Sequence, residues 1–368
     1  MSADKISVGI VGIVGLPAKY GGFETLADNL VRKLGETFDI EVICSSKAYK
    51  DPVPSYLKAK LKYLPLHANG LSSILFDMLG IIILCLRRKK IVLVLGVSGA
   101  MILPLVKLFS QVKIVTNIDG LEWKRQKWSK LAKVYLRFAE ALAVKYSDVV
   151  IADNQAIVEH IQTVYGKNSI KIAYGGDNNT AVKVGSLPAE VSRAGDYYLG
   201  ICRIEPENNV HVILDAFKAS PAQTLVFVGN WDASGYGKKL FQEFCKFPNI
   251  ILLDPIYEPS LLHELRRKCV GYVHGHSAGG TNPSLVEMMH YNCRILAFDC
   301  SYNRFTLNNY GTYFNCFEEL SVLVEKLRDK KALQDQDEIS AVLSLAKCEY
   351  TWDKVSEKYR KLFYDLTL

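Results

Sequence analysis

The chain alternates strand and helix most clearly in Val270-Gly271-Tyr272-Val273-His274-Gly275-His276, which leads through two residues into Gly279-Gly280-Thr281-Asn282-Pro283-Ser284-Leu285-Val286-Glu287. The first stretch is a short apolar run typical of a buried strand, and the second carries the start signals of a helix. Asn282 is a preferred N-cap residue, and Pro283 fits the first helical position, where a missing N–H costs nothing. The glycine pair ahead of them allows a tight turn and leaves the free amides of the helix start uncovered. A strand, a glycine turn and a helix in this order predict a parallel α/β sheet.

The same turn has the chemistry of an anion site. Free backbone amides and the helix dipole attract phosphate at the start of a helix. Glu287 lies one turn further along, where its carboxylate could reach past a phosphate to a sugar hydroxyl. We therefore expect this stretch to bind a ligand with phosphate and sugar groups, through Gly280, Thr281, Asn282, Ser284, Leu285 and Glu287.

Short apolar strands alternate with helical patterns along the rest of the chain. In the first half the predicted strands are residues 6–12, 40–44, 91–95, 112–116 and 149–152. In the second half they are residues 197–201, 224–228, 250–253, 271–274 and 294–298. Longer helical patterns, such as residues 25–34 and 131–146, lie between them. This alternation predicts an α/β fold with two doubly wound parallel sheets.

The length of the chain favours two domains. Its 368 residues are enough for two domains that each bury a core. Residues 175–195 lie between the two strand series, are rich in Gly, Asn, Ser and Pro, and are expected to form a linker. Two α/β halves that face each other across a cleft would place a binding crevice at the carboxyl ends of their strands. The hydrophilic residues 330–339 are expected to form a surface loop.

The composition excludes several classes of protein. With 49% hydrophobic and 23% charged residues the chain is neither disordered nor fibrous. Its nine cysteines are odd in number and scattered, without a CxxC pair or a Cys/His cluster, so neither a zinc site nor a disulfide framework is expected. The first residues lead directly into a predicted strand, so we expect no signal peptide and a cytoplasmic location.

Positive charge is concentrated in the first half. Residues 1–180 hold about 24 Lys and Arg against about 15 Asp and Glu, a net charge near +9, whereas the remainder is near −2. The excess gathers around residues 58–62, 87–90 and 124–137. Nucleic acid or an anionic membrane surface could meet such charge, although a solubilising face is the better interpretation for any single cluster. Nucleic acid is disfavoured because this half lacks interleaved exposed aromatic residues.

Residues 74–86 form a strongly apolar run that ends in Arg87-Arg88-Lys89-Lys90. The run is too short to span a bilayer, and Asp77 interrupts it. We favour a buried helix of the α/β domain. The alternative is a helix that lies on a membrane, with its apolar side in the lipid and its basic residues at the head groups.

Two further stretches follow predicted strands. Gly21 and Gly22 lie between the first strand and the first helix, where they allow close approach of the backbone to phosphate or sugar, although neither a Walker loop nor a clean GxGxxG fingerprint is present. Arg203 leaves the first strand of the second half. Its planar guanidinium there suits a pyrophosphate as well as an ion pair with Glu205 or Glu207.

A third stretch, Asp119-Gly120-Leu121-Glu122-Trp123-Lys124-Arg125, follows a strand of the first half. Asp119 and Glu122 could act on an acceptor hydroxyl or orient a sugar, and Arg125 could neutralise an acceptor phosphate. The competing interpretation is a structural Asx turn with a buried Trp123.

Taken together, these stretches resemble the retaining glycosyltransferases of family 4, which have the GT-B fold. In particular they resemble a bacterial polysaccharide subgroup that includes rhamnosyltransferases and whose first domain was long classed as a domain of unknown function. The resemblance covers nearly the whole chain and is carried by Pro17-Ala18-Lys19-Tyr20-Gly21-Gly22-Phe23-Glu24-Thr25, Asp119 to Arg125, Arg203-Ile204-Glu205-Pro206-Glu207-Asn208-Asn209, Gly229-Asn230-Trp231-Asp232 and Gly279 to Glu287. Tyr350-Thr351-Trp352-Asp353-Lys354 opens a helix like the last helix of the family, which crosses back onto the first domain. The implied domains are residues 1–177, with 350–368 packed on them, and residues 178–349.

The resemblance implies that the second domain holds a nucleoside-diphosphate sugar and that the first holds the acceptor. Arg203 would meet the diphosphate, helped by the amides from Thr281 to Leu285, and Glu287 would bond the nucleotide ribose. The remaining implied contacts are Gly21 and Gly22 at the other side of the diphosphate, Ile256 and Tyr257 at the base, and Asp119, Glu122 and Arg125 at the acceptor. The implied catalytic residues are Arg203, Glu287 and Asp119.

Two positions depart from the family pattern. The family usually has a glutamate eight positions before Glu287 that contacts the donor sugar, and this chain has Gly279. A lysine normally follows the arginine by five residues, and this chain has Asn208, so Lys238 or Lys239 could supply the missing positive charge. Loss of a contact to a sugar hydroxyl would suit a 6-deoxy donor such as dTDP-rhamnose, and a UDP-sugar is the other candidate.

The implied activity is transfer of a hexose or deoxyhexose, with rhamnose favoured, to a lipid-linked saccharide of the undecaprenyl diphosphate type. It would serve bacterial O-antigen or capsule synthesis at the inner face of the cytoplasmic membrane. The resemblance implies front-face attack with retention, and Arg203 with a helix start can stabilise the leaving diphosphate without a metal. Asp335 and Asp337, the aspartate pair spaced like a metal site, lie in the predicted surface loop, so we expect no metal or other cofactor. The alternatives are a nucleotide-sugar epimerase of GT-B type and a non-enzymatic protein that binds a membrane surface.

Overall fold

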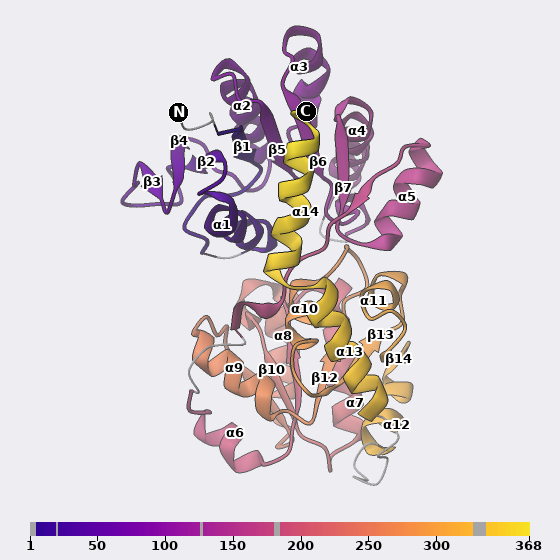
Figure 1. Ribbon diagram of the computed structural model, residues 1–368. Helices are drawn as coiled ribbons and strands as arrows, with labels where there is room; N and C mark the ends of the chain where they lie inside the picture. Colours follow the sequence, from indigo (N-terminus) through magenta and orange to yellow (C-terminus); the bar gives the residue numbers. More distant parts are fainter. Residues whose placement is uncertain (1–4, 20, 126–127, 180–184, 327–335) are drawn as a thin grey trace. The chain divides into compact units, whose positions relative to one another are not determined.

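The structure is a computed structural model that describes residues 5–19, 21–125, 128–179, 185–326 and 336–368. The chain forms two compact units, the first made of Met1–Tyr174 with Trp352–Leu368 and the second of Gly175–Thr351. Each unit has its own sheet with helices packed against it (Figure 1). The prediction of an α/β fold with two doubly wound sheets is confirmed.

The first unit is built on an eight-stranded sheet in the order β3-β4-β2-β1-β5-β6-β7-β8. Neighbouring strands pair in parallel except the short β3, which pairs antiparallel with β4 at the edge. The strands are β1 (Ser7–Val11), β2 (Asp39–Ser45), β3 (Ser55–Tyr56), β4 (Ala59–Leu64), β5 (Ile91–Leu95), β6 (Lys113–Asn117), β7 (Val149–Ala152) and β8 (Ile170–Lys171). The helices are α1 (Gly22–Leu34), α2 (Ser72–Leu86), α3 (Leu103–Phe109), α4 (Lys130–Tyr146), α5 (Gln155–Tyr165) and α14 (Trp352–Asp365), with 3-10 turns η1 (Ala100–Ile102) and η2 (Glu122–Lys124).

The helices of the first unit cover both faces of this sheet. The crossover through α1 runs from β1 to β2, toward one edge of the sheet, whereas α2, α3, α4 and α5 lie in crossovers that run toward the other edge. Because such crossovers are right-handed, α2 to α5 share one face and α1 covers the opposite face. The C-terminal α14 packs against α1, as Figure 1 shows.

Helix α14 completes the core of the first unit. Trp352, Val355, Tyr359 and Phe363 are buried in the same hydrophobic cluster as the strands. The Tyr359 hydroxyl also accepts a hydrogen bond of 3.0 Å from the side-chain amide of Asn117, at the end of β6. The last residues of the chain are therefore a structural part of a unit that begins more than three hundred residues earlier.

The second unit has a six-stranded parallel sheet in the order β11-β10-β9-β12-β13-β14. Its strands are β9 (Tyr198–Ile201), β10 (Leu225–Val228), β11 (Ile250–Leu253), β12 (Gly271–His274), β13 (Arg294–Phe298) and β14 (Thr312–Phe314). Its helices are α6 (Ala189–Ala194), α7 (Val210–Ala219), α8 (Gly235–Phe244), α9 (Pro259–Lys268), α10 (Pro283–Met288), α11 (Ser301–Thr306), α12 (Phe317–Lys326) and α13 (Gln336–Glu349), with 3-10 turns η3 (Asp177–Asn179), η4 (Pro206–Asn208) and η5 (Trp231–Ala233).

Each sheet reverses its strand order beside its first strand. In the second unit the chain goes from β9 outward to β10 and β11, then returns to β12 on the other side of β9. In the first unit the same reversal lies between β1 and β5. The loops that leave two strands in opposite directions separate at such a point, so ligands bind there, at the carboxyl ends of the strands.

Several sequence predictions need correction. The predicted linker 175–195 contains η3 and α6. Val191 of α6 is buried, so this part of the segment packs against the second unit. The predicted surface loop 330–339 is helical from Gln336 onward, and its earlier residues lie outside the described part of the chain. The predictions also missed strands β3, β4, β8 and β14.

The lysine clusters of the first unit are also partly structural. Lys60 and Lys62 are the exposed members of β4, whose Ala59 and Leu61 are buried. In the cluster 87–90, Lys89 is buried and forms ion pairs with Asp39 and Glu41 at 3.1 and 3.2 Å. None of the helices within the described residues is long and apolar enough to cross a membrane.

Candidate functional site

Two loops meet at the reversal point of the second unit. One follows β9 and carries Arg203, and the other follows β12, the hydrogen-bonded neighbour of β9. The side-chain amide of Asn209 donates to the carbonyl oxygen of Gly275 at 2.8 Å, and the backbone N–H of Ser277 donates to the carbonyl oxygen of Glu207 at 2.9 Å. A Cβ on Gly275 would lie 2.1 Å from the carbonyl oxygen of Asn208, so the close approach requires glycine. These hydrogen bonds and the close backbone contact thus hold the two loops together.

Arg203 presents its guanidinium at this place. Its side chain is 47% exposed and lies 3.7 Å from the carboxylate of Glu205, measured from Nη2 to Oε2. An exposed pair at this distance contributes at most about 1 kcal/mol, so it holds the guanidinium only weakly. Glu207, the other partner considered from the sequence, is buried. Arg203 is therefore available to an incoming anion.

Asn208 lies under the loops and is almost completely buried. Its amide nitrogen donates to the backbone carbonyl oxygen of Arg203 at 2.7 Å, and its amide oxygen lies 2.8 Å from Nδ1 of His276. Because the amide nitrogen already donates, the amide oxygen accepts and His276 Nδ1 carries a proton. Asn208 thus fixes the backbone of Arg203 and the ring of His276 at the same time.

The segment from Gly279 to Glu287 follows the sequence prediction closely. Asn282 is the N-cap of α10, where its side-chain oxygen accepts hydrogen bonds from the backbone N–H and the hydroxyl of Ser284 at 3.0 and 2.8 Å. Pro283 occupies the first turn, which confirms the predicted helix start. Gly280, Thr281 and Leu285 are buried.

At position 279 the resemblance predicts a glutamate, and the backbone conformation explains why this chain has glycine. Its φ is +145°, a conformation that residues with a side chain rarely adopt. A Cβ at this position would lie 2.7 Å from Nε2 of His276. The imidazole of His276 therefore occupies the space into which a side chain at position 279 would extend.

Glu287 receives an ionic partner that the sequence did not indicate. Arg266, from the last turn of α9, is 3% exposed and donates from Nη2 to Oε2 of Glu287. Its neighbours Arg267 and Lys268 instead pair with Glu264 on their own helix. In the sequence the three cations look like one surface cluster, and only the packing of α9 shows that Arg266 points inward and orients the Glu287 carboxylate.

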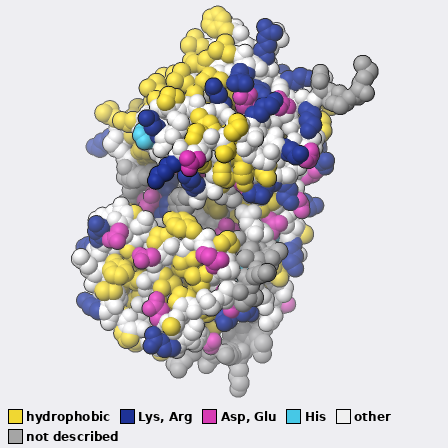
Figure 2. Space-filling model, turned by 90° about the vertical axis from the view of Figure 1, so that its left-hand side faces the viewer, with side chains coloured by type: hydrophobic (Ala, Val, Ile, Leu, Met, Phe, Trp, Pro, Cys, Tyr) yellow, Lys and Arg dark blue, Asp and Glu magenta, His cyan; other side chains and the backbone are white. Residues whose placement is uncertain are grey.

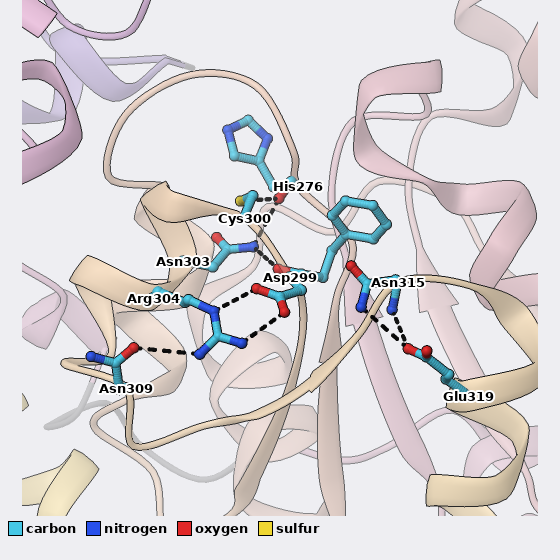
Figure 3. Close-up of polar contacts among 9 residues, drawn as sticks. His276, Asp299, Cys300, Asn303, Arg304, Asn309, Asn315 and Glu319 are labelled. Carbon is cyan, nitrogen blue, oxygen red and sulfur yellow. Dashed lines mark hydrogen bonds and ion pairs between the residues drawn. The ribbon is translucent and has the colours of Figure 1, made fainter.

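Figure 3 shows how α11 holds the loop after β12 in place. The side-chain amide of Asn303 donates to the carbonyl oxygens of His276 and Phe298, each at 2.8 Å. Arg304 forms a two-pronged ion pair with Asp299, at 2.5 and 2.7 Å, and this pair closes the turn between β13 and α11. The backbone of His276 is thus fixed from the β13 side as well as from the β9 side.

Histidine 274, at the end of β12, is fully buried. Burial, and to a smaller extent the neighbouring His276, hold the pKa of His274 well below its ordinary value. The imidazole is therefore neutral and packs in the interior beneath the two loops.

The remaining residues predicted for the second unit lie in its other loops and helices. Ile256 and Tyr257 follow β11, and the Tyr257 ring is 66% exposed. Lys238 and Lys239 are exposed on α8. Ile256 and Tyr257 thus lie in the loop that leaves the carboxyl end of β11, and α8 follows β10 of the same sheet.

In the first unit, the predicted residues 119, 122 and 125 lie in the loop after β6 and in η2. Asp119 has a φ of 59°, and its N–H donates to the side-chain oxygen of Asn117 at 3.0 Å, which forms the Asx turn considered from the sequence. Arg125 is buried, and its Nη1 donates to Oε1 of Glu122 at 2.7 Å. Trp128 donates to the other oxygen of Glu122 at 2.9 Å. Glu122 and Arg125 therefore form part of a fixed framework, whereas Asp119 is half-buried.

A buried carboxylate supports this framework. Glu140 of α4 is 1% exposed. Its two oxygens lie within hydrogen-bond distance of Trp123 Nε1, His160 Nε2 and the Tyr165 hydroxyl, at 2.9, 2.9 and 2.8 Å. These partners come from two other elements, η2 and α5, so no local sequence pattern could have indicated the cluster.

Gly21, at the start of α1, borders a pocket of the first unit. Gly21 is the N-cap of α1 with a φ of 123°, and a Cβ there would lie 2.0 Å from Oε2 of Glu24. The pocket has a volume of about 320 Å³ and is lined by Val14, Lys19, Gly21, Glu24, Tyr49 and Asn69. Burial raises the pKa of Glu24, and a hydrogen bond of 2.9 Å from the Val14 N–H partly offsets this shift. The sequence had not singled out Glu24 as a site residue.

The described residues include no group of three or more His, Cys, Asp or Glu side chains that could hold a metal ion. Asp337 lies in the first turn of α13, and Asp335 is outside the described part of the chain.

Comparisons with known proteins bear on the fold. The family model described as "Domain of unknown function (DUF1972)" matches residues 5–177, which correspond to the first unit without α14. Among curated proteins none matches the chain.

Solved structures resemble the chain over its whole length. Sucrose-phosphate synthase from Thermosynechococcus elongatus has a TM-score of 0.81 at 12% identity, over 99% of both chains. HepE from Anabaena, in complex with UDP and glucose, has a TM-score of 0.72 at 14% identity, over 98% of this chain and 100% of that chain. The catalytic domain of starch synthase IV from Arabidopsis thaliana, bound to ADP and acarbose, has a TM-score of 0.70 at 12% identity, over 99% of both chains. The chain has the GT-B fold.

Proposed function

We propose that this protein is a retaining glycosyltransferase of family 4 that transfers a hexose or deoxyhexose from a nucleoside-diphosphate sugar. The observation that carries the proposal is the meeting, at the carboxyl ends of β9 and β12, of the Arg203 loop with the loop that leads into the Gly279–Glu287 segment. The fold supports it, because HepE with UDP and glucose and starch synthase IV with ADP share this fold.

The second unit holds the donor in this proposal. The Arg203 guanidinium exchanges its weak contact with Glu205 for the diphosphate, which offers more charge and accepts two parallel hydrogen bonds. Glu287, oriented by Arg266, accepts hydrogen bonds from the ribose hydroxyls. Tyr257 and Ile256 provide an apolar surface for the base.

Arg203 acts mainly on the leaving group. The bond between the anomeric carbon and the diphosphate oxygen breaks, and a bond from the acceptor hydroxyl oxygen forms on the same face of the sugar. The proton of that hydroxyl passes to the departing diphosphate. A guanidinium beside the diphosphate stabilises the charge developing on it, and such stabilisation is the main requirement of this reaction.

The acceptor in this proposal is a lipid-linked saccharide of the undecaprenyl diphosphate type, bound by the first unit. The pocket beside Gly21 offers Glu24, Lys19 and Asn69 as hydrogen-bonding groups for saccharide hydroxyls, and Asp119 lies half-buried after β6. The reaction then takes place at the inner membrane face in O-antigen or capsule synthesis. The absence of a side chain at Gly279 favours a 6-deoxy donor such as dTDP-rhamnose over a UDP-hexose.

Replacement of Arg203 tests the assignment. With purified donor and a short lipid-linked acceptor, Arg203→Ala is expected to lower kcat about 100-fold or more, because the leaving diphosphate loses its cation. Arg267→Ala is the matched control, since Arg267 lies in the same unit, has a half-exposed side chain and pairs with Glu264 on its own helix. The control should stay within about twofold of the wild type.

Two results would overturn the proposal. One is a wild-type rate in the Arg203→Ala variant. The other is conversion of the donor in the absence of any acceptor with retention of the diphosphate linkage, which would indicate an epimerase.

A further inference from the structure

Helices α2, α3 and α4 of the first unit expose large apolar side chains that nothing in the unit covers. Leu108 and Phe109 of α3 are 72% and 81% exposed, and Leu131 of α4 is 84% exposed. Leu75 and Leu79 on α2 and Val134 on α4 continue the set. We call these six residues the apolar helix face.

These residues belong to one surface. The three helices lie in crossovers that run in the same direction across the sheet, so they form one layer on one side of it. Helix α3 packs against α4, and the η1 turn before α3 packs against both α2 and α4. On α2 the buried residues, Phe76, Gly80 and Leu84, form a stripe toward the sheet, so Leu75 and Leu79 point away from it.

Figure 2 shows hydrophobic side chains gathered over the upper part of the first unit, with Lys and Arg side chains beside them. Exposed apolar groups on a monomer are usually scattered, and a contiguous patch marks a contact surface.

The charges around this face select its partner. The only carboxylates that the three helices carry are Asp77 and Glu140, and both are buried. Lys130, Lys133 and Arg137 lie on α4. Arg88 and Lys90, just after α2, are exposed as well. Exposed apolar side chains on helices that also carry lysines and arginines are complementary to a bilayer that contains anionic lipids.

We infer that the apolar helix face docks the protein on an anionic lipid bilayer, with Leu108, Phe109 and Leu131 inserted at the acyl boundary and the lysines and arginines at the head groups. Asp77, which interrupts the α2 run in the sequence, does not oppose this contact because it faces inward. A second copy of the chain fits the face less well, since a symmetric dimer would oppose like charges. The inference rests on the proposed function in one respect: the lipid-linked acceptor is the reason for the protein to bind a membrane.

Vesicle flotation with the full chain tests the docking surface. Vesicles of phosphatidylcholine with about 30% phosphatidylglycerol are compared with pure phosphatidylcholine, at about 0.1 M and about 0.5 M salt. The wild type is expected to float with the anionic vesicles at low salt and at least tenfold less with neutral vesicles or at high salt.

Substitutions then locate the contact. The double variant Leu108→Asp with Phe109→Asp, and separately Leu131→Asp, should lose at least tenfold in vesicle binding. All three positions are exposed, so folding should be retained, and circular dichroism checks this. The matched control Val322→Asp changes an exposed apolar residue on α12 of the second unit, and should bind as the wild type does.

Three outcomes overturn the inference. They are a wild type that does not float with anionic vesicles, α3 and α4 variants that bind as well as the wild type, and a wild-type dimer in solution that these variants convert to monomer, since the face would then be a self-interface. Thermal stabilisation by nucleoside diphosphates is measured in parallel, so failure of docking and failure of the proposed function are separate results.

Discussion

Position 279 has two structural constraints that only glycine satisfies. Its backbone lies in a region that favours glycine, and the space beyond its Cα is occupied by the ring of His276. That ring is itself fixed, because Asn208 holds its Nδ1 and Asn303 holds its backbone carbonyl. The two departures from the family pattern, at positions 208 and 279, are thus connected through His276.

This arrangement makes Gly279→Ala costly. We expect the substitution to lower the free energy of unfolding by about 1 to 3 kcal/mol, since it adds backbone strain and displaces a fixed imidazole. Gly235→Ala is the matched control, because a Cβ at Gly235 meets open space and the residue starts α8 with an ordinary φ. Urea denaturation of both variants measures the difference. Equal stability of the two would contradict the constraint.

Asp77 is expected to make stability depend on pH. Burial raises its pKa from 3.8 to about 7, and a hydrogen bond from the Ser98 hydroxyl opposes this only in part. Between these values the folded protein keeps a proton that the unfolded chain releases, so stability falls as the pH rises. The slope is at most about 1.4 kcal/mol per pH unit, and it is absent below the lower value.

The variant Asp77→Asn should remove this slope and be more stable than the wild type at pH 8. Urea denaturation at several pH values between 4 and 8 gives the comparison, with the exposed Asp51→Asn as control. A wild type whose stability does not fall over this range would show that the Asp77 carboxyl is not held in its protonated form.

At the scale of elements, α14 ties the end of the chain to the first unit. The Tyr359 hydroxyl and the Asn117 amide satisfy each other in a place without solvent. Tyr359→Phe leaves the amide without that acceptor, and we expect a loss of about 1 to 3 kcal/mol.

The neighbouring Tyr364→Phe is the control for this loss, since Tyr364 packs its ring on Phe38 from an exposed position. It should change stability by no more than about 0.5 kcal/mol. The two variants are compared by thermal and urea denaturation. A Tyr359→Phe variant as stable as Tyr364→Phe would mean that water replaces the hydroxyl.

Strands with uninterrupted apolar runs were predictable, whereas very short or alternating strands were not. The predicted bounds of β5, β7, β11, β12 and β13 agree with the structure, because these strands read as short, mainly apolar segments. Strand β4 alternates Lys60 and Lys62 with buried residues, so its lysines were interpreted only as a charge cluster. Strand β14 contains three residues, too few for a period to show.

The site was predictable where it depends on local signals. Asn282 and Pro283 mark their helix start in the sequence itself. The partners that position the site come from distant parts of the chain: Arg266 for Glu287, Asn303 for His276 and Glu140 for Trp123. Side-chain direction on α9, α11 and α4 decides those contacts, and it follows from packing rather than from spacing.

At the scale of the whole molecule, each unit buries its own core, so a ligand can stabilise one unit without the other. The residues proposed for the nucleotide, Arg203, Glu287 and Tyr257, all belong to the second unit. A nucleoside diphosphate should therefore raise the free energy of unfolding of the second unit, by about 2.7 kcal/mol at a concentration 100-fold above its Kd.

Hydrogen exchange measured with UDP, dTDP and GDP resolves this unit by unit. We expect the nucleotide that matches the donor to slow exchange in the segments 203–209 and 275–287, while the amides of β1, β2 and β5 exchange as before. Arg203→Ala should need at least a tenfold higher nucleotide concentration for the same protection, because the diphosphate loses its cation. Arg267→Ala should need the same concentration as the wild type. Protection confined to the first unit would place the nucleotide beside Gly21 instead, and equal protection of the wild type and Arg203→Ala would remove Arg203 from the site.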